Sequence, residues 1–375
     1  MFKKQQQKAG DSSQQFQAEQ MTVVTGIDEK RAREIVDEKL GETIKNYSLE
    51  SQKIAEERIQ LFADDLIPKL VKNSLLNGLK EPSVQMLLLD AQKTAASTER
   101  ATDYSLLSEL LIHRVKKGDD RNIRAGISRA VEIVDEITDE ALLGLTVAHS
   151  VVSFMPALGE IGKGISILND LFSKLLDDDI FSLPKGYDWL DHLDILNTIR
   201  VSHLGNMKKL NQYYSEQLSG YVDVGIKKDS ENYTKAHELL QQVNLPSTAT
   251  LVEHELRLGY VRLPLVNKDN IDSLSLTKNQ VIINSGQVLT IPVNQELNRK
   301  QKDTLNEIYE LYENNQQLKN ENITKFIEIW DSYDSLKKVH DWWDNLPQSF
   351  TITAAGKVLA HVNAQRCDPS LPPLN

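Results

Sequence analysis

The sequence contains very little cysteine, few aromatic residues and less basic than acidic charge. Its single cysteine, Cys367, excludes an internal disulfide and a zinc site built from several cysteines, and it fits a reducing compartment. Aromatic residues make up only 6%, and 43 basic residues stand against 54 acidic ones, which gives a formal net charge of −11. Because phosphate contacts need a basic face, this charge argues against a general nucleic-acid binder, although it leaves a local basic patch open.

A secretory signal and a phosphate loop are also missing. The start, MFKKQQQKAG, carries positive charge but no apolar stretch follows it, so we expect a cytoplasmic protein. Gly159, Gly162 and Gly164 are spaced somewhat like a phosphate loop, but no predicted strand precedes them and no GK[ST] follows. We expect these glycines to let the chain turn before an amphipathic helix, and we predict no cofactor.

One stretch is nominally long and uncharged enough to cross a bilayer. Residues 141–159, ALLGLTVAHSVVSFMPALG, are 19 residues without a formal charge. The stretch also contains polar residues and Pro156, and acidic residues precede it where a basic flank would be expected. We therefore predict a buried core helix here. The alternative is a membrane-acting effector that exposes residues 141–172.

Residues 82–155 have the clearest helical pattern, with four amphipathic segments and almost no linker between them. Apolar residues recur three and four positions apart in the segments, which is typical of a helix with one buried face. We predict helix N-caps at Ser83, at Asp103, at one of Asp119, Asp120 or Asn122, and at Thr138. The short loops favour antiparallel packing of neighbouring helices, as in a bundle or an α-solenoid.

Two runs in this region carry a family resemblance. They are KEPSVQMLLLDAQKTAA from Lys80 and SLLSELLIHRVKKGDDRNIRAGISRAVEIVDEITDEALLGL from Ser105. With their "EPSVQ…LLxAQ" and "LLxxLLxxR" segments, they resemble an uncharacterised bacterial protein family that has no assigned activity. Its members are similar to proteins of mobile elements and phage-defence neighbourhoods. The resemblance implies a bacterial cytosolic setting and antiviral defence, and it brings no catalytic residues.

The N-terminal residues alternate between apolar and polar side chains. Phe16 and Ala18, then Met21 and Val23, follow the period of two that indicates a β-strand. A lone strand is not stable by itself, so these residues must pair with something if they are ordered. We predict that copies from several subunits join in an intersubunit sheet or barrel; a disordered leader is the alternative.

A long helical segment follows this strand pattern. Ile27 and Asp28 have the character of a staple residue and a helix cap, and apolar positions that include Ile35 then continue the helical pattern to Leu70, with a break near residues 46–51. Charges of both signs occupy the other face. Such a face is usually solvated, but a coiled-coil stem between subunits would show the same pattern, so we predict that Ile27 and Ile35 contribute to oligomerisation.

The richest cluster of candidate metal ligands lies near residue 190. Asp188 with His192, or Asp191 with its neighbour Asp194, could share one helix face, and His203 follows further along. Carboxylate and imidazole groups could hold a divalent cation for hydrolysis, which makes a metal-dependent hydrolase one alternative. A chain this acidic produces such clusters by chance, so we predict no metal and no catalytic site.

The last third of the chain shows a change of pattern after Pro246. A helix over 248–258, a strand over 260–265 and a hairpin turning at 284–286 resemble a winged helix. Residues 247–300 contain six basic and five acidic residues, so a winged-helix DNA-binding regulator lacks the charge it would need. Trp342 and Trp343 are adjacent and cannot point the same way on a helix. We predict that one anchors the core while the other faces a partner or a loop, so both are candidates for a partner surface.

These observations predict a mainly α protein. We expect a multi-helix bundle or α-solenoid-like core, a short N-terminal β segment and a small α+β, winged-helix-like C-terminal unit. The expected divisions are a β oligomerisation segment (1–26), a long helical stem (27–79), a helical core (80–245), a C-terminal α+β domain (246–363) and a Pro-rich tail (364–375). The function we predict is a non-enzymatic, homo-oligomeric scaffold or sensor that also binds another protein.

Overall fold

The computed structural model describes most of the chain and confirms a mainly α fold. The described residues are 26–43, 48–117, 120–176, 182–202, 205, 207–273, 275–284 and 287–374; side chains are not described for 42–43 and 273–295. The first eight helices are α1 (Glu29–Thr43), α2 (Leu49–Lys72), α3 (Pro82–Ser97), α4 (Ala101–Lys116), α5 (Arg121–Ile133), α6 (Asp139–Ser153), α7 (Ile161–Leu175) and α8 (Asp188–Ile195).

The second half of the described chain mixes shorter helices with strands. Its helices are α9 (Leu210–Gln217), α10 (Ser219–Val222), α11 (Glu231–Gln242), α12 (Ser247–Thr250), α13 (Arg299–Tyr309), α14 (Gln316–Asp331), α15 (Asp334–Asp344) and α16 (Ala354–Cys367). The strands are β1 (Ile199–Ser202), β2 (Ile226–Lys227), β3 (Val252–Glu253), β4 (Tyr260–Arg262), β5 (Ser275–Asn284), β6 (Gln287–Glu296) and β7 (Ser349–Ile352).

Two of the four predicted helix caps are confirmed. Asp120 caps α5 and Thr138 caps α6, each accepting a hydrogen bond from a backbone N–H in the first turn. The predictions at Ser83 and Asp103 are wrong, because α3 begins at Pro82 and α4 at Ala101. Proline suits the first turn since its missing N–H would have no helical partner there.

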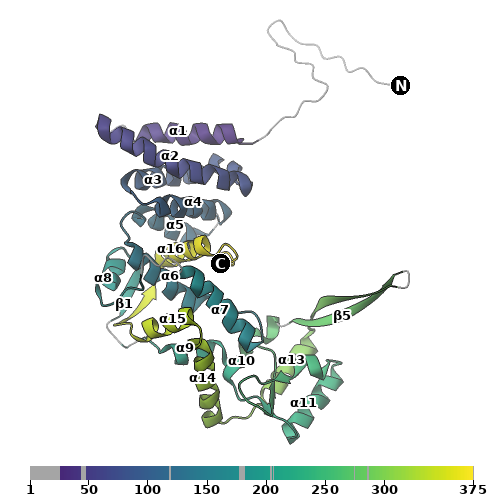
Figure 1. The fold of residues 1–375 in the computed structure, drawn as a ribbon. Coiled ribbons are helices and arrows are strands. Elements are labelled where there is room, and N and C mark those ends of the chain that lie inside the picture. Colours follow the sequence, from purple (N-terminus) through teal and green to yellow (C-terminus); the bar gives the residue numbers. More distant parts are fainter. Residues whose placement is uncertain are drawn as a thin grey trace, which may run out of the picture.

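The helices form a stack in which each of the first helices packs against the one or two helices that follow it along the chain (Figure 1). From one end the order is α1, α2, α3, α4 and α5, and then α16 and α6. This arrangement is solenoid-like in that short loops bring consecutive helices side by side. The helix that breaks the order is α16, which comes from the far end of the sequence and packs against α4, α5, α6 and α7.

Residues 27–79 are an integral part of this stack rather than a separate stem. Ala32, Ile35 and Val36 of α1 and seven residues of α2 are buried, and most of them belong to the same core as α3 to α7. The outer face of α1 carries ion pairs of Arg31 with Glu34 and Glu38, and of Arg33 with Glu29. A charged outer face is what the end layer of a helical stack requires.

The uncharged stretch 141–159 is a buried core helix followed by a turn. Residues 141–142 and 144–151 of α6 are all buried, between α16, α7 and α8. Over the ranges that the structure describes, no helix has both the length and the apolar character needed to cross a membrane.

The region after residue 222 contains a second, smaller core. Strands β2, β4 and β3 form an antiparallel sheet in that order, and apolar residues between Ile226 and Ile308 pack on it with α11 and α13. Strands β5 and β6 form a separate two-stranded hairpin from Ser275↔Glu296 to Asn284↔Gln287. The predicted hairpin is thus confirmed, although turn residues 285 and 286 lie outside the described residues.

The resemblance to a winged helix fails at its helix. Only Ser247–Thr250 is helical, and the rest of the predicted 248–258 segment forms β3 and the turn before β4. The hairpin does not join the three-stranded sheet. His254 is buried in this segment, and its ring Nε2 forms a hydrogen bond with the carbonyl of Asp223. The segment is therefore a buried turn and not an exposed recognition helix.

The chain then returns from the small core to the stack. Helices α14 and α15 pack against α10, α9 and α7, β7 pairs with β1, and α16 enters the stack. The region 246–363 that the sequence presents as one C-terminal domain is therefore divided between two cores.

Candidate functional site

The described residues border a partly open groove, which we call the Trp342 groove. Its volume is about 670 Å³. It lies between α15 and the segment that leads into α8, and its lining residues are Leu176, Ser182, Leu183, Pro184, Lys185, Gly186, Lys338, Asp341, Trp342, Asn345, Leu346 and Pro347. A concave, mostly apolar site of this size with a few polar groups is the usual form of a binding pocket.

Trp342 forms the fixed wall of this groove. Its indole N–H donates a hydrogen bond of 2.9 Å to the carbonyl of Pro184, and its ring lies 5.8 Å from that of Trp189. Gly144 of α6 lies behind, where an added Cβ would approach Pro184 to 2.6 Å and Trp189 to 3.0 Å. The missing side chain at Gly144 therefore lets α6 pack closely against Trp189 and against Pro184, which lines the groove.

The rim of the groove is polar. Lys185, Lys338 and Asp341 are exposed there, so both signs of charge border the apolar floor. Such a combination can bury apolar side chains of a peptide while its backbone and charged groups stay at the wet edge.

The part of Trp342 and Trp343 in a partner surface stays a prediction, and both side chains are buried. The two rings do point in different directions, but Trp342 is 8% exposed and Trp343 is 2% exposed. The Trp343 indole N–H donates to the carbonyl of Lys208, and its ring packs near Tyr213. Because an indole N–H needs an acceptor when it is buried, both tryptophans are fixed inside the chain, and only Trp342 borders a cavity.

The candidate metal ligands near residue 190 are not brought together among the described residues. Asp188 and Asp191 are exposed in the first turn of α8, where they suit the positive end of the helix dipole, and the His192 ring accepts a hydrogen bond from the Thr138 N–H. Asp194 accepts from the Val201 N–H, and His203 lies outside the described residues. Within the described part of the chain, no three histidine, cysteine, aspartate or glutamate side chains are placed to hold a metal ion.

Of the predicted oligomerisation residues, Phe16, Ala18, Met21 and Val23 lie outside the described residues. Ile35 is 4% exposed and Ile27 packs partly buried against the same core. Ile35 is therefore used inside its own chain and is not free to contact a second copy, which corrects the prediction for that residue.

A buried histidine cluster in the stack was not predicted from the sequence. The rings of His149 and His361 lie within 3.2 Å of one another (Nε2 to Nδ1), His361 also bonds the Pro372 carbonyl, and His113 bonds Gln365. Burial lowers the pKa of His149 to about 3 and that of His361 to about 4, and lowers that of His113 as well. The neutral rings can then donate and accept within the core.

The glycines of residues 159–164 lie where the stack meets the small core, and their role differs from the predicted one. A Cβ on Gly159 would lie 2.2 Å from the Pro264 carbonyl oxygen, and one on Gly164 would lie 2.1 Å from the Tyr221 hydroxyl. Gly162 has space. These glycines therefore permit close packing rather than only a turn.

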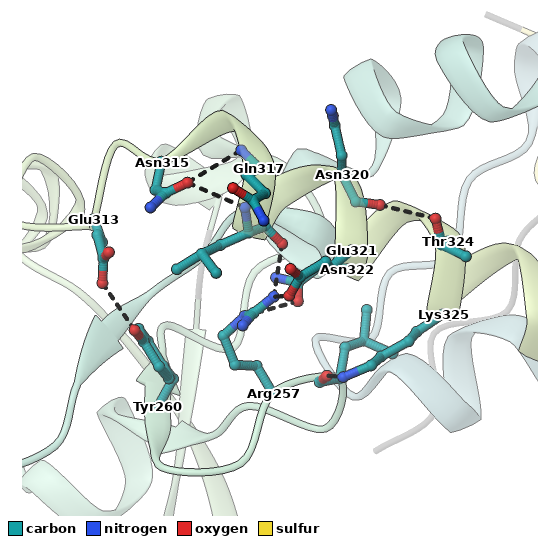
Figure 2. Close-up of polar contacts among 12 residues, drawn as sticks. Arg257, Tyr260, Glu313, Asn315, Gln317, Asn320, Glu321, Asn322, Thr324 and Lys325 are labelled. Carbon is teal, nitrogen blue, oxygen red and sulfur yellow. Dashed lines mark hydrogen bonds and ion pairs between the residues drawn. The ribbon is translucent and has the colours of Figure 1, made fainter.

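Arginines complete this junction. Arg262 is fully buried and donates to the carbonyls of Gly159 and Gly220 on the stack side and to those of Leu263 and Leu265 in the small core. Glu255 accepts from the N–H groups of Ile161 and Gly162 at the start of α7. Figure 2 shows the second arginine, Arg257, which extends from the turn before β4 to Asn322 and Glu321 of α14 at 3.0 and 2.8 Å.

A polar pocket of about 370 Å³ lies beside α13. The Asp223 carboxylate accepts from the Tyr309 hydroxyl and pairs with the Lys319 ammonium at 2.6 Å. Burial, with the Asp223 charge, raises the pKa of Tyr309 far above its usual value. The phenol stays protonated and acts as a donor that fixes the carboxylate, which is a structural role.

The fold and the groove together define a helical-stack protein with a largely apolar groove. A family profile described as a family of unknown function matches residues 26–371, and the chain therefore belongs to this family. Comparison with curated proteins and with solved structures found no match.

Proposed function

We propose that this protein is a non-enzymatic, homo-oligomeric scaffold that binds an apolar segment of another protein in the Trp342 groove. The observation that carries the proposal is the groove itself, a cavity of about 670 Å³ with a fixed tryptophan wall and a rim of mixed charge. Aromatic residues in well-packed pockets supply much of the energy of protein interfaces.

The resemblance described above supplies the proposed setting. We place the protein in the bacterial cytoplasm, in antiviral defence, where a sensor must recognise a partner and assemble. The alternating pattern of residues 16–23 supports assembly through an intersubunit sheet, since an isolated strand is unstable.

The groove is tested with a library of displayed random peptides selected against the full chain. We expect selected peptides to share apolar residues and to change the tryptophan fluorescence, because Trp342 borders the groove. Lys338→Trp, which fills the rim, weakens their binding about tenfold, or about 1.4 kcal/mol. Lys337→Trp, one position along α15 and outside the lining, leaves it unchanged. Equal affinity of both variants and the unmodified chain would refute the groove as the binding site.

Assembly is tested by light scattering on the purified chain. Deletion of residues 1–26 should lower the mass of the particle. Phe16→Ser, Met21→Ser and Val23→Ser together should do the same, whereas Gln15→Ser, Gln17→Ser and Gln20→Ser together should not. A particle mass that does not respond to the deletion contradicts assembly through this segment.

The defence role is tested by infecting bacteria that express the chain with a panel of phages. We expect fewer plaques than with an empty vector, and a loss of protection when Lys338→Trp is introduced. Equal plaque numbers across the whole panel count against defence without affecting the groove.

A further inference from the structure

A second cavity, which we call the arginine pocket, lies where α3, α4 and α5 meet. Its volume is about 490 Å³, and its lining residues are Ser83, Arg114, Arg121, Arg124, Ala125 and Ser128. Three guanidinium groups and two hydroxyls thus converge, and no acidic side chain is among the described lining residues. This is unexpected in a protein with a formal net charge of −11.

Arg114 is the fixed member of the pocket. It is 5% exposed, and it donates a hydrogen bond of 2.7 Å to the hydroxyl of Ser83 at the start of α3. Burial and the nearby charge of Arg124 both lower the pKa of Arg114, while Glu81 raises it. Two like charges are therefore held close together on a partly dehydrated wall, an arrangement that a bound anion would stabilise.

The other two arginines are available to a ligand. Arg121 and Arg124 make no hydrogen bond or ion pair within the part of the chain that the structure describes, whereas Arg129 on the same helix pairs with Glu132 at 3.0 Å. Asp120, the nearest described carboxylate in sequence, accepts hydrogen bonds from the N–H groups of Asn122 and Ile123. Asp120 is thus engaged in capping α5.

Glu81 is an acidic side chain close to the pocket, where it offsets part of the positive charge of the arginines. Its carboxylate accepts a hydrogen bond of 3.2 Å from the Ser83 hydroxyl, the same hydroxyl that accepts from Arg114. Among the described side chains, the carboxylates of Glu81 and Asp120 stand against three guanidinium groups, which leaves an excess of positive charge at the pocket.

We propose that the arginine pocket binds the phosphate group of a small phosphorylated molecule. Guanidinium groups match phosphate oxygens with paired N–H donors, and a dianion uses several of them where a carboxylate needs one. A long nucleic acid is disfavoured, because the whole chain is strongly acidic and the pocket is confined to six residues. The site is separate from the Trp342 groove and does not rest on the proposed scaffold role.

The test is calorimetric titration of the full chain at constant ionic strength, with inorganic phosphate, with a nucleoside monophosphate and with acetate. Constant ionic strength matters because salt screens surface charge. We expect phosphate or the monophosphate to bind and acetate not to bind. Tighter binding of inorganic phosphate identifies free phosphate as the ligand, and tighter binding of the monophosphate identifies a phosphate ester.

Variants on α5 connect any binding to the pocket. Arg124→Gln and Arg121→Gln should each weaken binding at least about tenfold. Arg129→Gln makes the same change on the same helix outside the pocket and should leave affinity unchanged. Because Arg121 and Arg124 hold no described partner, these variants should melt close to the unmodified chain, and the ligand should raise the melting temperature only where it binds. No binding of either phosphate, equal binding of acetate, or unchanged affinity in Arg124→Gln would overturn the proposal.

Discussion

The helical stack and the small core are assembled in different ways from one chain. The buried residues of the small core all lie between Ile226 and Ile308. Those of the stack extend from Ala32 to Ala364, because α14, α15 and α16 return to it after the small core is complete. The small core is nearly continuous in sequence, whereas the stack depends on contacts between distant segments. We therefore expect deletions and substitutions of similar size to lower stability by different amounts in the two cores.

Removal of α16 should have the largest effect. Deleting residues 353–375 uncovers the faces of α4, α5 and α6, since α16 is buried on nearly all sides. We expect the stack to lose its cooperative thermal transition and to aggregate, as circular dichroism and size-exclusion chromatography would show. A truncated chain that melts like the intact one would show that the stack is stable without α16 and does not depend on contacts between distant segments.

A fall in pH should have the second-largest effect and should lower the unfolding free energy of the stack. His149 and His361 have pKa values lowered to about 3 and about 4, below the ordinary value of 6.5, so the unfolded chain binds protons that the folded chain does not. Their stabilising effect is complete above about pH 6.5 and is lost as the pH falls toward 4. At pH 5 each should cost about 2 kcal/mol of unfolding free energy.

Urea titrations between pH 7.5 and 5 measure this loss. The double variant His149→Gln, His361→Gln should flatten the dependence about twice as much as His254→Gln, a single buried histidine at the junction whose pKa is lowered to about 4. Identical slopes in all three proteins would rule out the histidines as the source.

The junction between the two cores offers a matched pair of glycine substitutions. Gly159→Ala places a Cβ against the Pro264 carbonyl and should cost about 1–3 kcal/mol, as overpacking does. Gly162→Ala, three residues on at the start of α7, meets nothing closer than 3.9 Å and should stabilise the protein by about 0.4–1 kcal/mol. Chemical denaturation measures both, and equal effects would show that the close approach at Gly159 does not limit packing.

The smallest effect should come from the β5–β6 hairpin. Its two strands pair with each other and with no other described strand, and it projects from the small core in Figure 1. Replacing residues 275–296 with a short glycine-serine linker should leave the melting temperature of the stack unchanged. A drop like that from removing α16 would place the hairpin in the core.

What the sequence could predict was local. Helices and caps such as Asp120 and Thr138 follow from residues within one or two turns, and the hairpin follows from its own alternation and turn. The predictions of helix caps at Ser83 and Asp103 failed because both side chains bind other side chains instead of the backbone N–H groups of a first helical turn. The Asp103 carboxylate bonds the Thr98 hydroxyl and pairs with Arg100 at 3.0 Å.

What the sequence could not predict depends on segments far apart. Nothing local in the sequence of α16 says that this helix inserts between α5 and α6, because a helix buried all round shows no polar face. The Trp342 groove needs the 182–186 segment beside α15, and the arginine pocket needs Arg114 brought next to Arg124. In the sequence the acidic residues Asp119 and Asp120 lie between those two arginines, so the local charge pattern does not indicate a basic site.

The late position of α16 also sets the timing of folding during synthesis. About 220 residues separate the end of α5 from the start of α16, which at about 5–20 residues per second takes roughly 10–45 s of translation. The small core, continuous in sequence, can close while the ribosome is still at work. During that interval the apolar faces of α4, α5 and α6 that α16 later covers remain exposed to water. A chaperone that shields nascent chains should therefore matter more to the yield of this protein than to that of a solenoid whose repeats close in order.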